Sequence, residues 1–180
     1  MDYRSAVHVA AAVEGDQVVL ATVAAATFPL ACPPSAAPED ISTFIAATLS
    51  EQRFAEYLTD PNRVVLTAAD AGRTVGYAML IRGVGDDPDI YGSVPQRPAV
   101  ELSKMYVLPD YHRTGVAAAL IRSGIGWAAG SGARAVWLGV NQNNERAQRF
   151  YRKHRFEVTG TRRFRLGAVL EDDFVMVRPL

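Results

Sequence analysis

In the first third of the chain, hydrophobic side chains return every three or four positions, the period of a helix that buries one face. The run from Gln17 to Phe28 predicts a helix that ends at Pro29, and residues 38–59 predict one long helix or two broken ones. Before them, Tyr3 to Val13 has the composition of a strand. This part of the chain is therefore expected to be mainly helical.

After residue 60 the pattern changes to β-rich runs that alternate with helical ones. The expected elements are strands at Arg63–Ala69 and Thr74–Arg82 joined by a hairpin turn at Gly72, a loop at Gly83–Pro98, a strand at Ala99–Leu108, a helix at Thr114–Ala129, a strand at Val136–Val140, a helix at Asn144–His154 and two strands in the tail around LGAVLEDD. This order predicts an α+β (mixed α/β) fold and argues against a doubly wound sheet. The length of 180 residues fits a single domain spanning 1–180.

Composition removes several classes of protein. Lys plus Arg and Asp plus Glu are both 19, and this zero balance argues against a dedicated nucleic-acid binder. Cys32 is the only cysteine, and the three histidines are scattered, so neither an intrachain disulfide nor a metal site is expected. Prolines interrupt the one long uncharged run, at residues 17–38, and no export signal precedes it. We expect a soluble cytoplasmic protein that does not enter the membrane.

A candidate binding turn lies in the stretch LPDYHRTGVAAAL, where a strand stops and a helix starts. The first N–H groups of a helix have no partner within it, and together with the helix dipole they form a site for an anion. Gly115 and the alanines after it leave room for a ligand, while His112 and Arg113 add charge. For the turn alone, packing of small residues against a sheet is the favoured alternative.

Two stretches together resemble the GNAT acetyltransferase superfamily. HRTGVA resembles its acyl-CoA pyrophosphate loop and follows a strand ending in MYVLPDY, and NNERAQRFYRKHRFE resembles its second signature. The resemblance is strong from Val100 to Val158. It implies a GNAT-like fold, a central mostly antiparallel mixed sheet with a splayed strand pair and flanking helices, and acetyl-CoA as co-substrate. Two positions depart from the pattern: His112 replaces Gln or Arg, and Arg155 replaces a glycine at a turn for which a positive φ is expected.

The resemblance also implies roles for individual residues. Tyr151 matches the tyrosine that protonates the departing sulfur, and Glu101 lies where histone-type members carry their base; a glutamate on an exposed strand face is the alternative. Asn144 faces the pantetheine and also caps its helix. Phe150 is expected in the core and His154 on the helix surface. The backbone of the splayed strand would pair with pantetheine, and the loop would hold the phosphates; the expected cofactor-binding residues are Met105, Tyr106, Val107, His112, Arg113, Thr114, Gly115, Val116, Ala117, Ala118, Asn144 and Tyr151.

The acceptor is the least determined feature. The resemblance implies an N-acetyltransferase that transfers acetyl to a primary amine by direct attack. A looser likeness to the bacterial polyamine acetyltransferase-like branch, with the acidic stretches GDDPD and EDD, points to a polyamine or other small amine. The alternative is that both acidic stretches are solvated loops with no role in binding the acceptor. Amino acids, antibiotics and protein N-termini remain open, as do a non-catalytic acyl-CoA sensor or structural subunit, a nucleotide-binding module and a homodimer.

Overall fold

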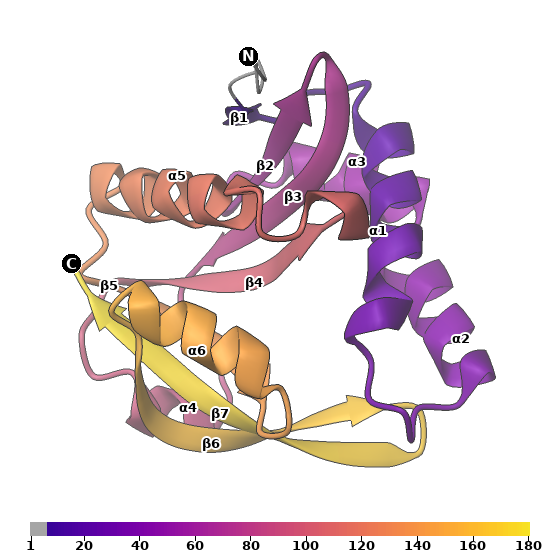
Figure 1. The fold of residues 1–180 in the computed structure, drawn as a ribbon. Helices are drawn as coiled ribbons and strands as arrows, with labels where there is room; N and C mark the ends of the chain where they lie inside the picture. Colours follow the sequence, from indigo (N-terminus) through magenta and orange to yellow (C-terminus); the bar gives the residue numbers. More distant parts are fainter. Residues whose placement is uncertain (1–6) are drawn as a thin grey trace. The chain divides into compact units, whose positions relative to one another are not determined.

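The computed structural model describes residues 7–180, and these fall into two compact units (Figure 1). Of the described residues, unit 1 comprises 7–80 and Lys104–Gly124, and unit 2 comprises Ile81–Ser103 and Ile125–Leu180. Three elements, β3 (Arg73–Arg82), β4 (Ala99–Val107) and α5 (Val116–Gly130), run from one unit into the other. The expected strand at Tyr3–Val13 falls partly outside the described residues, and its described part is β1 (His8–Ala11).

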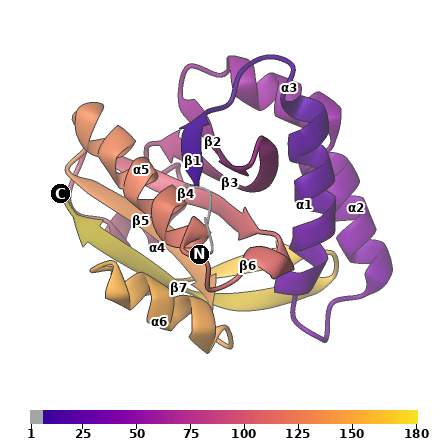
Figure 2. The same cartoon turned by 45° about the horizontal axis from the view of Figure 1, so that its top comes forward.

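Three helices and a hairpin make up most of unit 1. The helices are α1 (Gln17–Ala31), α2 (Pro38–Thr48) and α3 (Glu51–Thr59), and the hairpin strands are β2 (Arg63–Asp70) and β3 (Arg73–Arg82). β1 pairs antiparallel with β2. Helix α1 contacts both α2 and α3, and α3 contacts β2, so the helices pack against the hairpin as one group (Figure 2). The chain breaks between α2 and α3, as one of the two sequence alternatives predicted.

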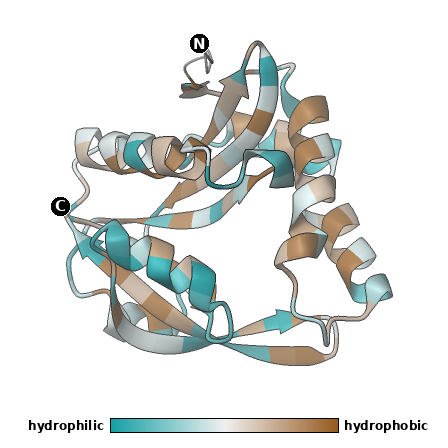
Figure 3. Cartoon of the chain, viewed as in Figure 1, coloured by the Kyte–Doolittle hydropathy of each residue, from teal (hydrophilic) through white to brown (hydrophobic). Residues whose placement is uncertain are grey.

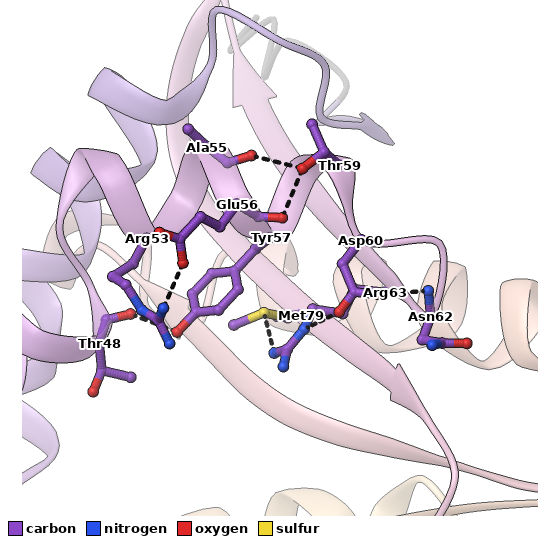
Figure 4. A network of polar contacts seen from close by, with 10 residues as sticks. All are labelled: Thr48, Arg53, Ala55, Glu56, Tyr57, Thr59, Asp60, Asn62, Arg63 and Met79. Atoms are coloured by element: carbon purple, nitrogen blue, oxygen red, sulfur yellow. Dashed lines mark hydrogen bonds and ion pairs between the residues drawn. The ribbon is translucent and has the colours of Figure 1, made fainter.

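The corner between α3 and β2 is fixed by polar contacts around Tyr57 (Figure 4). The Tyr57 hydroxyl donates a hydrogen bond to the carbonyl of Thr48 at 2.9 Å. The Arg63 guanidinium lies 4.6 Å from the centre of the Tyr57 ring and also pairs with Asp60, at 2.8 Å. A second guanidinium, that of Arg53, lies 5.4 Å from the same ring. Cation–π and hydrogen-bond contacts therefore hold the end of α3 against the start of β2.

Unit 2 is built on antiparallel strands. Its elements are β5 (Ala135–Asn141), β6 (Glu157–Leu166), β7 (Val169–Pro179), α4 (Pro88–Ser93) and α6 (Glu145–Lys153). β7 pairs antiparallel with all of β5 through its residues Asp173–Pro179, and with β6 in a hairpin. Trp137 lies in a buried cluster with apolar residues of α4 and β7. Helix α6 is mainly hydrophilic (Figure 3).

The strand order is β1-β2-β3-β4-β5-β7-β6, which confirms a mixed, mostly antiparallel GNAT-like sheet. The β4–β5 pair is parallel, and its recorded register runs only from Ala99 opposite Ala135 to Glu101 opposite Trp137. Both strands continue well beyond this point, as in the predicted splayed pair. Within residues 7–180, no helix is long and apolar enough to cross a membrane.

Three local expectations need correction. Gly83–Pro98 is not all loop: Asp87 caps α4 by accepting from the amide of Asp89, and Pro88 takes the first helical position, where its missing N–H costs nothing. Helix α1 continues past Pro29 for half a turn, because a proline so near the end removes only one helical hydrogen bond. The acidic stretch EDD is not a loop but part of β7.

Candidate functional site

The predicted binding turn has an unusual backbone. Between β4 and α5 the chain makes a short 3-10 turn at Pro109–Tyr111, and then Arg113 and Gly115 both adopt a positive φ, +64° and +95°. An added Cβ on Gly115 would meet no atom within 4 Å, so its φ, and not lack of space, requires glycine. The helix begins at Val116, two residues later than the sequence predicted, with Gly115 accepting the first helical hydrogen bond, from Ala119 at 2.9 Å.

The start of α5 presents a row of unpartnered donors. Within residues 7–180, the structure records no acceptor for the amides of Gly115, Val116, Ala117 and Ala118. No acidic side chain lies in the first turn of the helix. Four such amides at the positive end of a helix dipole fit an anionic group. The small side chains and the open space at Gly115 leave room for it.

The side chains of the turn stabilise its shape. The Thr114 hydroxyl donates to the carbonyl of Tyr111 at 2.6 Å. The exposed His112 places Nε2 at 2.9 Å from the carbonyl oxygen of Val107, so Nε2–H is the donor in this contact. His112 thus links the turn to the end of β4. The position where the family pattern has Gln or Arg is occupied here by a side chain with a backbone partner.

The predicted pantetheine strand is the second half of β4. Met105, Tyr106 and Val107 are all half-buried. The Tyr106 ring packs 6.3 Å from the Phe28 ring and 5.9 Å from the Tyr77 ring, centre to centre. Sequence reasoning missed Gly76 on β3: a Cβ there would come within 2.9 Å of the Tyr106 carbonyl oxygen, so glycine lets β4 approach this closely.

In unit 2, helix α6 carries Asn144 and Tyr151. The Asn144 side chain caps the helix by accepting from the amide of Ala147 at 3.0 Å, which confirms its predicted capping role. Gln148, which sequence reasoning missed, is buried and donates to the carbonyls of Asn141 and Gln142 at 3.2 and 2.8 Å. These bonds tie α6 to the end of β5 and so set the position of Tyr151 one turn further on.

Burial raises the pKa of Tyr151 to about 12. The phenol is therefore protonated at neutral pH, as a proton donor must be. Its ring contacts Phe156 and Phe150, with centres 5.9 and 5.5 Å away. Phe150 was expected in the core but is only half-buried, and its ring packs at a tilt against His154 at the end of the helix, 4.5 Å between ring centres.

Helix α6 ends in a Schellman motif with Arg155 at the left-handed position. Phe156 donates to the carbonyl of Tyr151 at 3.1 Å, and Arg155 donates to that of Arg152 at 3.0 Å. Arg155 has a φ of +65°, so the turn does need a positive φ here. The departure from glycine therefore leaves the shape of the turn unchanged and adds strain to the backbone.

Glu101, the candidate base, lies in unit 2 at the last recorded residue pair of β4 with β5. Its carboxylate is 3.8 Å from Nη1 of Arg162, and both side chains are about one-fifth exposed, 21% and 19%. Nε of Arg162 lies 3.3 Å from the carboxylate of Asp173. Glu101 is thus not on a freely solvated strand face. The sequence pointed to Asp173 only as part of the acidic stretch EDD and missed Arg162, because their strands meet Glu101 only in the folded sheet.

Comparison with known proteins assigns the chain to a family. Residues 20–156 match the family model described as acetyltransferase (GNAT) family. A Mycobacterium tuberculosis protein named as an uncharacterized N-acetyltransferase is 62% identical over 161 residues, which cover 89% of this chain and 96% of that protein. A Mycobacterium bovis protein named in the same way matches equally well.

Solved structures share the fold at low identity. The PaiA N-acetyltransferase from Thermoplasma acidophilum, solved in complex with coenzyme A, matches with a TM-score of 0.78 and 18% identity, over 97% of this chain and 99% of that one. The ribosomal-protein-S18-alanine N-acetyltransferase from Escherichia coli matches with a TM-score of 0.68 and 20% identity, over 96% and 93%. With both signature stretches and the expected sheet in place, the chain belongs to the GNAT family of N-acetyltransferases, which use acetyl-CoA as the acetyl donor.

Proposed function

We propose that this protein transfers the acetyl group of acetyl-CoA to a primary amine of a small molecule. The observation that carries the proposal is the start of α5, where four backbone amides have no recorded acceptor within residues 7–180. A pyrophosphate carries the charge and the acceptor oxygens that such a helix start binds. The backbone of Met105, Tyr106 and Val107 would hold the pantetheine by strand-like pairing. Residues 1–180 act in this proposal as a single catalytic domain.

Two side chains would handle the protons. Acetyl-CoA supplies the acetyl group as a thioester. An alkylamine with a pKa near 10.4 is mostly protonated at neutral pH, so Glu101 accepts its proton through a water molecule and leaves a neutral nucleophile. Tyr151 gives its proton to the departing thiolate, and the high pKa of its phenol ensures that the proton is present. The amine nitrogen attacks the thioester carbon directly, without an acetylated enzyme.

A cationic acceptor fits the charges around Glu101. Glu101 lies on β4, and Glu171 and Asp173 lie on β7, with β5 between the two strands. Arg162 pairs with Glu101 and with Asp173. This local excess of negative charge favours an ammonium group over a carboxylate. The loop acids contribute less to this argument than expected, because Asp87 serves as the cap of α4. A polyamine such as spermidine is the first acceptor to test.

Release of free thiol from acetyl-CoA in a panel of amines tests this proposal. The panel pairs spermidine with an amino acid, an aminoglycoside antibiotic and a peptide with a free N-terminus. We expect spermidine to react and its Michaelis constant to rise with salt, since ions screen charges over a Debye length of about 10 Å. Reaction of the peptide alone would identify a protein acceptor. Binding of acetyl-CoA without thiol release from any amine would indicate a sensor.

A further inference from the structure

Glu101 belongs to a polar cluster on one face of the sheet in unit 2. Side chains alternate across a strand, so Trp137 and Gly139 of β5 share the face of Glu101, which is paired with Trp137. On β7, Asp173 lies two residues from Val175, which pairs with Gly139, and Arg162 on β6 pairs with Asp173. Three further strands thus bring a glycine, an arginine and an aspartate to the face that carries the proposed base.

The guanidinium of Arg162 lies directly on the backbone of β5 at Gly139. A Cβ added at Gly139 would be 2.2 Å from Nη2, 2.4 Å from Cζ and 2.4 Å from Nε of Arg162. Any side chain at this position would therefore displace the guanidinium. The Trp137 ring lies beside it, 5.8 Å from Cζ to the ring centre. The absence of a side chain at Gly139 thus leaves room for the guanidinium of Arg162 against the backbone of β5.

Asp173 anchors the other edge of the guanidinium. Asp173 is 6% exposed, and its carboxylate lies 3.3 Å from Nε of Arg162. Burial raises the pKa of Asp173, and the charge and hydrogen bond of Arg162 partly offset this effect. Because a guanidinium is planar and rigid, holding Nε against Asp173 and the plane against Gly139 also fixes the direction of Nη1. Nη1 is the atom that faces Glu101.

We infer that Arg162, seated on Gly139 and anchored by Asp173, is a positioning residue that holds the Glu101 carboxylate charged and in place for proton transfer. The separation of 3.8 Å is longer than a hydrogen bond, so Arg162 acts on Glu101 through its charge. This inference rests on the proposed function, in which Glu101 is the base. It goes further by assigning roles to Arg162, Gly139 and Asp173.

The pH dependence of the reaction reports this role. A positive charge near Glu101 favours the carboxylate, so its removal moves the acidic limb of the activity profile to higher pH. Loss of the Arg162 charge also makes Asp173 easier to protonate. The Glu101→Gln/Arg162→Gln double variant therefore shows which of the two carboxyl groups causes the shift in the pH profile. The charged groups on the strands of this part of the sheet and on α4 are, besides Glu101, Arg73 and Arg82 on β3, Asp89 on α4, Lys104 on β4 itself, Glu157, Arg162, Arg163 and Arg165 on β6, and Glu171, Asp172, Asp173 and Arg178 on β7.

The experiment measures kcat/KM against pH for six variants of the full chain, of which Glu101→Gln and the Glu101→Gln/Arg162→Gln double variant are two. Arg162→Gln removes the charge, Arg162→Lys restores it without the planar fork, and Gly139→Ala displaces the guanidinium without altering any charge. Arg163→Gln is the matched control, because Arg163 is the exposed neighbour on β6 and lies on the opposite face. Circular dichroism and calorimetry with acetyl-CoA verify that each variant folds and binds the co-substrate.

We expect Arg162→Gln and Gly139→Ala to lose on the order of tenfold to a hundredfold in kcat/KM, with an acidic limb at higher pH and unchanged affinity for acetyl-CoA. Arg162→Lys recovers part of the loss, and Arg163→Gln behaves like the parent. The Glu101→Gln/Arg162→Gln double variant should have the same acidic limb as Glu101→Gln alone, because the carboxyl group that Arg162 acts on is absent from both. Loss of activity with the parental limb would make Arg162 merely structural and overturn the inference. A parental profile in Glu101→Gln would instead overturn the proposed base, and the inference with it.

Discussion

At the scale of single residues, the two proposed proton-transfer groups have opposite surroundings. Tyr151 is surrounded by aromatic rings on and after α6, and burial raises its pKa. Glu101 faces the guanidinium of Arg162. An apolar site keeps a phenol protonated, and a nearby cation keeps a carboxylate charged. Tyr151 is thus protonated at neutral pH, as its proposed role requires, and we infer that the charge of Arg162 favours the carboxylate form of Glu101.

Replacing Tyr151 with phenylalanine tests the proton donor. We expect kcat to fall by roughly 10² to 10⁴, while the affinity for acetyl-CoA changes little, because only the hydroxyl is lost. Since the pKa of Tyr151 is about 12, the phenol stays protonated through neutral and mildly alkaline pH. The ratio of parent to variant kcat should therefore be constant up to about pH 9. A ratio that falls across this range, or equal activity, would remove Tyr151 from the mechanism.

At the scale of elements, the ends of two helices solve the same problem with different residues. Both α5 and α6 close in a Schellman motif. The left-handed position is Gly132 after α5, with a φ of +83°, and Arg155 after α6, with a φ of +65°. Only glycine adopts this conformation without strain. The chain thus provides a matched pair of sites at which to measure the cost of a side chain.

We expect Arg155→Gly to stabilise the protein by about 1 kcal/mol, because it removes left-handed strain from an exposed residue without breaking the motif. Gly132→Ala should destabilise it by a similar amount. Chemical denaturation measures both as shifts of the midpoint at constant slope. A loss of stability in Arg155→Gly would show that the arginine side chain contributes more than its backbone strain costs.

At the scale of the whole molecule, single helices and strands run from one unit into the other. Helix α5 begins in unit 1 with the proposed phosphate-binding amides and ends in unit 2, and β4 passes from unit 2 to unit 1. A helix cannot lose half its length without breaking its hydrogen bonds at the boundary. We therefore expect the chain to unfold in a single cooperative transition.

Acetyl-CoA at about a hundred times its dissociation constant should stabilise the protein by about 2.7 kcal/mol. For a chain of this length, this raises the Tm of that single transition by roughly 5–10 °C. Gly115→Ala should abolish most of the shift, because alanine resists the positive φ that aims the amides of the turn.

Gly126→Ala serves as the control for Gly115→Ala. Gly126 is an exposed glycine inside α5 with no neighbouring atom within 4 Å of an added Cβ, so this variant should keep the full shift. Two separate transitions, or a shift of only one of them, would contradict a single domain. A full shift in Gly115→Ala would show that acetyl-CoA does not use the turn.

Features that depend on neighbours along the chain could be predicted from the sequence. The helices, the hairpin at Gly72 and the cap at Asn144 follow from periodicity and from residues within one turn. The hairpin turn has positive φ at both Ala71 and Gly72, as its tight connection requires. Helix α4 was missed because its signal is only six residues long and stands among glycines and prolines.

The sequence by itself determined the family, the two signature stretches and the start of α5. A strand, a turn and a helix in this order leave free backbone amides at the helix start, whatever the rest of the fold is. Only the tertiary structure decided what surrounds Glu101. The strands that carry Gly139, Arg162 and Asp173 are far from it in sequence, and register between strands puts them on one face. In the sequence, Arg162 resembles any solvated residue of an alternating strand, and only the fold shows that Gly139, two strands away across β7, leaves room for its guanidinium.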